Sequence, residues 1–167
     1  MNARTDPRLA QALLLAEMGR AVVALEGFSR GACTCRNARC ATPGAHPIAD
    51  EKPTNYLRHV HSIWTRRPDA NVGLALGTVS GIFALQVDAK AGGHESVLRL
   101  EEAYGGLPVT LTAARDGNEW RVFKLPNGVT LNGSLGNAFP GLSILGDGKW
   151  IVVEPSIGPS ATSWLDC

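Results

Sequence analysis

Apolar side chains recur every three or four residues in three segments, the spacing that places them along one face of an α-helix. The apolar positions are Leu9, Leu13 and Ala16 in the first segment, Leu57, Val60, Ile63 and Trp64 in the second, and Val97, Leu100 and Tyr104 in the third. The segments are bounded by residues typical of helix starts and ends, namely Asp6-Pro7, Gly19, Pro68 and Gly105-Gly106. The pattern therefore predicts three helices.

Short runs of β-branched and aromatic residues, separated by turn residues, predict β-strands. The runs cover residues 21–25, 72–76, 82–87, 109–113, 120–125, 129–131, 142–145 and 150–153. Asp-Gly at 116–117 and 147–148 and Asn-Gly at 127–128 are hairpin-type turn signals, and Ser80-Gly81 marks a further turn. Because strands and tight turns dominate the second half, we predict an α+β fold with a mostly antiparallel sheet there.

Length and composition indicate an ordinary globular protein. The chain has 167 residues and a mass of 17.7 kDa, which suits one domain over residues 1–167. Hydrophobic residues make up 44% and charged residues 19%, a balance that excludes a disordered chain. The longest apolar runs are too short for a membrane-spanning helix or a secretion signal, so we expect a cytoplasmic protein without a membrane partner.

The charges are unevenly distributed along the chain. The formal net charge of +1 excludes a protein that binds nucleic acid through bulk charge alone. Residues 1–80 contain ten basic and six acidic side chains, whereas residues 81–167 contain six basic and nine acidic ones. A mildly basic surface near the N-terminus suits contacts with phosphates, and an ordinary solvated surface explains it equally well.

Three cysteines and a histidine lie close together in the sequence, at Cys33, Cys35, Cys40 and His46. Three thiols and an imidazole complete the tetrahedral ligand set of a structural zinc ion. The loop that carries them, an insertion at about residues 28–50, is polar and turn-rich. A bound metal would therefore order it more readily than packing into a hydrophobic core would. The alternatives are a disulfide, inert thiols and, for His46 before its proline, an ordinary loop residue. Cys167 is expected to take no part.

Several short phrases follow one another in a fixed order from about Leu9 to Trp164. They are the cysteine loop ending in Pro43-Gly-Ala-His46-Pro47, the phrase Arg67-Pro-Asp-Ala-Asn-Val-Gly73 after Trp64, the strand Ile82-Phe-Ala-Leu-Gln-Val-Asp88 followed by Gly92-Gly93, and the closing Gly141-Leu142, Gly146-Asp-Gly148, Val152-Val153 and Pro155-Ser156. In this order they resemble the N-terminal primase–polymerase (Prim-Pol) domain of bifunctional DNA primase/polymerases. The resemblance implies an archaeo-eukaryotic primase-like fold and a DNA-directed nucleotidyltransferase.

The resemblance also implies four active-site positions, and this chain departs from the family at three of them. Members hold two Mg²⁺ ions with an Asp-x-Asp pair and a third carboxylate, and a histidine contacts the nucleotide's phosphates. Here the pair reads Gln86-Val87-Asp88, the histidine position is Trp120, and the third carboxylate position is Ser143. Divalent cations of this kind prefer carboxylates, so Asp88 is the one catalytic remnant. The face of Trp120 could stack a base.

The family's register further predicts how the strand at 82–88 is placed. We expect it to lie centrally in the sheet, with Phe83, Leu85 and Val87 on one face and Ala84, Gln86 and Asp88 on the cleft face. The substitute ligands that the sequence offers for the missing carboxylates are Glu119, Asp147 and Glu154.

The sequence also contains candidate nucleotide-binding residues. Gly92-Gly93 would let the backbone approach a phosphate, and Arg121 and Lys124 lie on a strand beside the cleft, on opposite faces because they are three residues apart. A plain turn and ordinary surface charges are the alternative interpretations of these residues.

Two functions follow from these observations. The first is a binding module that contacts DNA or nucleotides within a replication or mobile-element protein, with nucleotidyl transfer lost or weak. The second is a working primase/polymerase that uses Mg²⁺ or Mn²⁺ at a rewired site. A helicase domain or a replication protein is the expected partner in either case. The number of carboxylates in the cleft favours the first.

Overall fold

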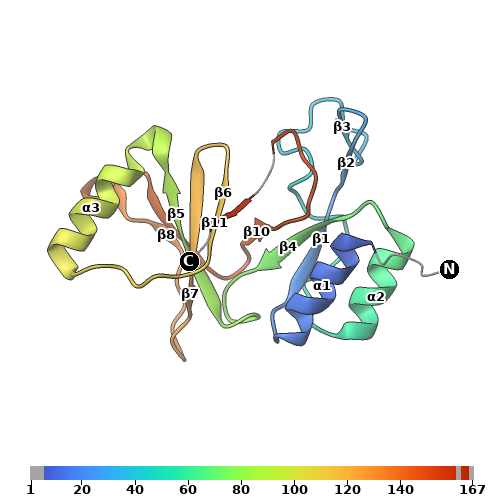
Figure 1. Cartoon of the computed structure of the whole chain (residues 1–167), viewed down its shortest axis with the longest axis horizontal. Helices are drawn as coiled ribbons and strands as arrows, with labels where there is room; N and C mark the ends of the chain where they lie inside the picture. Colours follow the sequence, from blue (N-terminus) through green and yellow to red (C-terminus); the bar gives the residue numbers. More distant parts are fainter. Residues whose placement is uncertain (1–5, 161–162, 166–167) are drawn as a thin grey trace. The chain divides into compact units, whose positions relative to one another are not determined.

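The computed structural model describes residues 6–160 and 163–165 (Figure 1). Its contacts divide the chain into two compact units. The first comprises Met1–Ala75 and Trp150–Thr162, and the second comprises Leu76–Lys149 and Ser163–Cys167. The single domain expected over residues 1–167 stays a prediction. Among the described residues, no helix has both the length and the apolar character needed to cross a membrane.

The first unit is a small antiparallel sheet with two helices. Its elements are α1 (Pro7–Glu17), β1 (Val22–Leu25), β2 (Phe28–Ser29), β3 (Ala32–Cys33), α2 (Leu57–Arg66), β4 (Asn71–Ala75) and β10 (Trp150–Val152). The strands β1, β4 and β10 form one sheet, with β4 in the middle, and α1 and α2 pack on each other and on this sheet. The Asp6 side chain caps α1 by accepting from the Arg8 backbone N–H at 2.8 Å, as its sequence predicted. The helix α2 buries Val60, Ile63 and Trp64, the stripe that its periodicity indicated.

The second unit is a six-stranded antiparallel sheet with one long helix. Its elements are β5 (Ile82–Asp88), the short 3₁₀ turn η1 (Ala89–Ala91), α3 (Gly93–Tyr104), β6 (Thr112–Arg115), β7 (Asn118–Lys124), β8 (Gly133–Ser134), η2 (Gly136–Ala138), β9 (Leu142–Leu145) and β11 (Ser163–Leu165). The strand order is β11-β6-β7-β5-β9-β8, and every neighbouring pair is antiparallel. The helix α3 packs on one face through a core formed by Leu85, Val87, Val97 and Leu142.

The mixed α/β architecture with antiparallel sheets confirms the predicted class in outline. The predicted strand at residues 129–131 is wrong, because this segment runs as an irregular chain after the turn at Asn127-Gly128. Hydrogen bonds of the Asn132 side chain, and not backbone pairing, hold the end of this segment. This side chain accepts from the Gly146 N–H at 2.8 Å and donates to the Asp147 carbonyl at 3.0 Å. The strand expected at 109–113 begins later, at Thr112, because Val109 is exposed at the surface.

The three hairpin-type turn signals have different outcomes. Asp116-Gly117 joins the paired strands β6 and β7, and both residues have the positive φ angles, 54° and 79°, that a type I′ turn requires. Asn127-Gly128 and Asp147-Gly148 do form turns, but the strands on either side of each are not partners. All three Asx-Gly pairs therefore mark turns, as predicted, but only Asp116-Gly117 joins two strands that pair with each other.

The Asp147 turn is held by a threonine on a neighbouring loop. The Asp147 carboxylate accepts from the Thr78 N–H at 2.8 Å and from the Thr78 hydroxyl at 2.7 Å. These two hydrogen bonds lower the pKa of Asp147 below its ordinary value of 3.8. Gly77 makes the approach possible, because a side chain there would collide with Asp147.

Thr78→Val removes the hydroxyl donor and should raise the pKa of Asp147. Because this pKa is lower in the folded state, its contribution to stability is present at neutral pH and is lost as the pH falls through the folded-state value. The variant should therefore be less stable than the natural chain at about pH 7, with the difference disappearing at acid pH below the folded-state pKa of Asp147. An NMR titration of the Asp147 carboxyl and unfolding curves at both pH values would measure this. An unchanged Asp147 pKa would contradict the assignment.

Candidate active site and metal centre

The strand register brings the four family positions together on the sheet of the second unit. Gln86 on β5 is the direct partner of Trp120 on β7 and of Ser143 on β9. Directly opposed residues of antiparallel strands project from the same face, so these three side chains form one row. Asp88 lies two residues further along β5, opposite Asn118. The central position predicted for this strand is confirmed, because β5 is flanked by β7 and β9.

The row lies on the face of the sheet that α3 does not cover. Leu85 and Val87 are buried in the core with α3, and Phe83 stacks with Phe123 at 5.5 Å between ring centroids. Alternation then places Ala84, Gln86 and Asp88 on the other face, as the sequence predicted. Gln86 is half-buried, and its Nε2 donates to Asn118 Oδ1 at 3.2 Å.

Asp88 has a local structural role in addition to its place beside the row. Its Oδ1 accepts from the Lys90 N–H at 2.9 Å and so caps the short turn η1. This hydrogen bond is what a strand-end aspartate would make without any catalytic duty. One carboxylate oxygen of Asp88 is thereby engaged, and the row itself contains an amide, an indole and a hydroxyl but no second acid.

The carboxylates considered as substitutes lie elsewhere. Glu119 is opposite Val87 and therefore on the α3 face, where its carboxylate lies 3.5 Å from Arg121 Nη2 and 3.9 Å from His94 Nε2. Asp147 is engaged with Thr78, and Glu154 belongs to the other unit. Within residues 76–149 no substitute acid shares the row with Gln86.

The candidate nucleotide-binding residues are spread over both faces. Arg121 is opposite Leu85 and so lies on the α3 face, whereas Lys124 is opposite Ile82, on the face of the row but at the far end of the strand. Gly92 has a left-handed φ of 81°, and Gly93 begins α3. Their roles in nucleotide binding stay predictions.

A pocket opens beside the row, between β5, β9 and β8. Its volume is about 440 Å³, and it is lined by Gln86, Asn132, Gly133, Ser134, Ser143, Ile144, Leu145 and Lys149. Amide, hydroxyl and ammonium groups line it together with the aliphatic side chains of Ile144 and Leu145, and none of its lining residues is acidic. Such a surface suits a neutral or anionic ligand better than a divalent cation. The sequence reasoning missed Asn132, Ser134 and Lys149, because no motif marks them.

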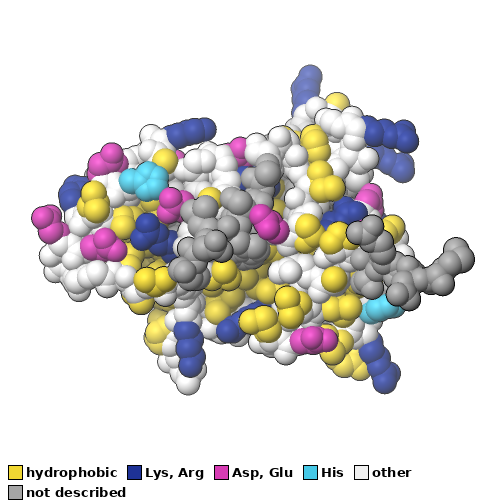
Figure 2. Space-filling model, in the orientation of Figure 1, with side chains coloured by type: hydrophobic (Ala, Val, Ile, Leu, Met, Phe, Trp, Pro, Cys, Tyr) yellow, Lys and Arg dark blue, Asp and Glu magenta, His cyan; other side chains and the backbone are white. Residues whose placement is uncertain are grey.

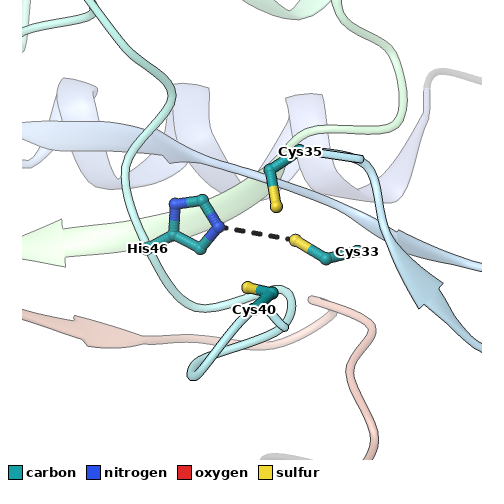
Figure 3. Close-up of side chains that lie close together, drawn as sticks. All are labelled: Cys33, Cys35, Cys40 and His46. Carbon is teal, nitrogen blue, oxygen red and sulfur yellow. Dashed lines mark hydrogen bonds between the residues drawn. The ribbon is translucent and has the colours of Figure 1, made fainter. Parts of the chain in front are cut away.

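The cysteine loop of the first unit forms a second centre, at which the four predicted ligands converge. One ligand atom from each of Cys33, Cys35, Cys40 and His46 lies within 4.8 Å of all the others (Figure 3). Cys33 Sγ and His46 Nε2 are 3.5 Å apart. A tetrahedral zinc ion with bonds of about 2.0–2.3 Å keeps its ligands roughly 3.5–3.8 Å apart, so these side chains fit such an ion with small adjustments. Cys167 lies outside the described residues.

Hydrogen bonds hold the loop against the sheet in the orientation that a metal needs. The His46 Nδ1 lies 3.3 Å from the Pro47 carbonyl, an acceptor, so Nδ1 carries the proton and Nε2 is left to bind the ion. The fully buried Asn71 donates to the Gly44 carbonyl at 2.9 Å, and Trp150 Nε1 donates to the Ala45 carbonyl at 2.9 Å.

The thiol environment also suits a cation. Burial raises the pKa of the Cys33 thiol, but hydrogen bonds with the backbone of Cys35 and Gly44 lower it. Further hydrogen bonds with the side chains of Cys35 and His46 add to this, and the pKa falls from 9.0 to about 7. Burial and the neighbouring Cys35 and Cys33 groups raise the pKa of Cys40. A bound cation relieves this mutual repulsion, because metals bind thiolates.

A family comparison agrees with this arrangement. The family model for the N-terminal domain of bifunctional DNA primase/polymerases matches residues 12–166. The chain belongs to the Prim-Pol family. This confirms the resemblance and extends across both units. Neither the curated proteins nor the solved structures that were compared gave a match. The Prim-Pol family acts on DNA and nucleotides and depends on metal ions, so both the row on β5 and the cysteine loop lie in a nucleotidyltransferase-type domain.

Protein purified without a chelator should contain about one zinc ion per chain, measured by elemental analysis. Cys40→Ser removes one thiolate ligand and should reduce this content severalfold and expose the loop to proteases. Cys167→Ser is the matched control and should retain the ion. A Cys40→Ser protein with full zinc content would contradict the assignment of Cys40 as a ligand.

Proposed function

We propose that this chain is a Prim-Pol domain that binds DNA or nucleotides and has lost nucleotidyl transfer or retains little of it. The observation that carries the proposal is the row on β7, β5 and β9, where Trp120, Gln86 and Ser143 lie side by side in register. If these positions are the counterparts of the family's ligand positions, the residues that would hold two Mg²⁺ ions are replaced by neutral ones.

Electrostatics gives the size of the deficit. Phosphoryl transfer depends almost entirely on positioning and on charge neutralisation by the metal ions. At a separation of about 4 Å and an effective dielectric constant of about 20, each carboxylate–cation charge pair contributes about 4 kcal/mol per unit charge. The amide of Gln86 and the hydroxyl of Ser143 carry no net charge, so two such contributions are missing. Asp88 alone cannot neutralise two divalent cations, so Mg²⁺ or Mn²⁺ would act only if the site retained activity.

Binding, by contrast, needs none of the lost carboxylates. The indole of Trp120 can stack on a base, and the pocket beside Gln86 presents hydroxyls, amides and the ammonium group of Lys149. These groups suit the sugar and phosphate of a nucleotide. The row therefore supports the binding of DNA or a nucleotide and does not support nucleotidyl transfer.

The proposal includes three further elements. The fold is of the archaeo-eukaryotic primase type, the cysteine loop holds a structural zinc ion, and the domain works in replication beside a helicase domain or another replication protein. The family assignment supports the first and third, and the convergence of three thiols with His46 supports the second. With four protein ligands the zinc would have no open position, so it would supply structure and no catalysis.

The transfer deficit is tested by restoring the acids. We expect the natural chain to extend a primer no better with Mg²⁺ or Mn²⁺ than an Asp88→Asn variant does. The triple variant Gln86→Asp, Trp120→His and Ser143→Asp rebuilds the family's ligand set and should extend the primer faster by at least an order of magnitude. Extension by the natural chain at the rate of the triple variant would mean that the site is rewired and active, and the proposal would fail.

The binding function is tested at Trp120. Trp120→Ala should weaken binding of a labelled oligonucleotide or nucleotide by about 1–3 kcal/mol, because a stacking surface is lost. Binding should be the same with and without added Mg²⁺, and fluorescence anisotropy would measure both. Trp120→Phe, which keeps an aromatic face, is the control and should retain most of the affinity. Equal loss in both variants would point to a structural role for the indole.

A further inference from the structure

The metal-binding loop carries a one-sided charge that the site on β5 does not explain. Residues 27–49 contain Arg30, Arg36 and Arg39 and no acidic residue. All three arginines are exposed, and Figure 2 shows Lys and Arg side chains projecting from the surface over β2 and β3. In the part of the chain that the structure describes, none of the three guanidinium groups forms an ion pair.

Two of these arginines occupy backbone positions that disfavour arginine. Arg30 and Gly31 form the two-residue turn between β2 and β3, with φ angles of 52° and 79°. Such a turn prefers Asn or Gly at its first position, because a long side chain is strained at positive φ. Arg36, directly after the ligand Cys35, has a φ of 61°. Local stability does not account for arginine at either position, so an interaction outside the loop is the better explanation.

The candidate metal ligands are next to these charges in the chain. Arg36 and Arg39 lie between Cys35 and Cys40, and Arg30 lies on the hairpin that ends at Cys33. Three thiolates around a divalent zinc ion carry one net negative charge, so the loop with its arginines stays positive. A bound ion would therefore order the backbone that carries the arginines and leave their charge available.

The described loop itself carries no large exposed hydrophobic side chain around which a protein interface could form, although Ile157 lies beside its Gly44. Protein interfaces are built around buried aromatic or aliphatic anchors. None of the large hydrophobic side chains exposed in the described chain lies between residues 27 and 49. Guanidinium groups match the evenly spaced phosphates of a nucleic-acid strand, each of which can accept two parallel hydrogen bonds.

We propose that Arg30, Arg36 and Arg39, which we name the arginine surface, bind the phosphate backbone of DNA. This inference rests on the proposed DNA-binding function and adds a contact separate from the row at Gln86. The arginine surface contributes affinity without base specificity, because its groups reach phosphates alone.

The test uses the zinc-loaded full chain and a fluorescent 20-nucleotide strand, free or as a duplex, over a series of salt concentrations. The variant Arg30→Asn, Arg36→Asn, Arg39→Gln should bind at least tenfold more weakly at low salt. Three phosphate contacts should lower the magnitude of the salt slope by roughly two for the single strand. Its melting temperature should be equal or higher, because Asn tolerates positive φ better, and its zinc content should be unchanged.

The matched control is Arg58→Gln, Arg66→Gln, Arg67→Gln, which removes the same charge from exposed positions on and directly after α2 in the same unit. It should retain affinity within about threefold and keep the salt slope. Equal losses in both triple variants would overturn the inference, because bulk charge would then explain binding. The inference would also be overturned if the arginine-surface variant bound DNA with the same affinity as the natural chain.

The result for Trp120→Ala separates this inference from the proposed function. If Trp120→Ala weakens binding and the arginine-surface variant does not, the arginine surface is wrong and the proposed function stands. If the natural chain binds neither the single strand nor the duplex nor a nucleotide, both are wrong. Weaker binding of either DNA form by the arginine-surface variant, with the control unaffected, supports the inference and shows which form the surface contacts.

Discussion

The register of β5 between β7 and β9 is the constraint on which the candidate active site depends. Gln86, Trp120 and Ser143 are far apart in sequence and meet only because Gln86 is the direct cross-strand partner of both Trp120 and Ser143. A slip of one residue on either side would move a side chain to the face covered by α3. The core packing of Leu85 and Val87 opposes such a slip, because it would expose them. The apolar face of β5 thus holds the polar face in place.

Close packing at the Asp88 end of β5 also fixes the register of this strand. The Asp88 N–H donates to the Gly141 carbonyl at 2.8 Å, at the entry to β9. A Cβ at Gly141 would lie 2.6 Å from the Gly93 nitrogen, and one at Gly93 would lie 2.7 Å from the Asp88 carbonyl oxygen. The two glycines therefore have a packing role whatever they do for a nucleotide. The frame of the site is set by groups that take no part in metal binding, so it can remain when the ligands are gone.

The sequence could predict features that depend on local periodicity and spacing. The three helices, the alternation along β5 and the four converging ligands of the cysteine loop are of this kind. Features that depend on a single polar contact between distant segments could not be predicted. Residues 129–131 form no strand, and the neighbouring Asn132 hydrogen-bonds to Gly146 and Asp147. The same two hydrogen bonds place Asn132 at the wall of the pocket. The family phrases singled out Gln86, Trp120 and Ser143, which the register brings side by side, whereas periodicity alone indicates no such pairing.

A metal ion would have a different role at each of the two centres, so the residues of one centre can change without affecting the other. The site on β5 would need Mg²⁺ to bring charge to a reaction, and that requires carboxylates that Gln86 and Ser143 do not supply. The cysteine loop would need zinc to hold a polar segment, residues 28–50, in which only Cys33 and Ile48 have buried side chains. The anchoring by Asn71 and Trp150 belongs to the loop and its own sheet and involves no residue of the row. The substitutions at Gln86 and Ser143 therefore remove no contact that anchors the loop or positions its candidate metal ligands.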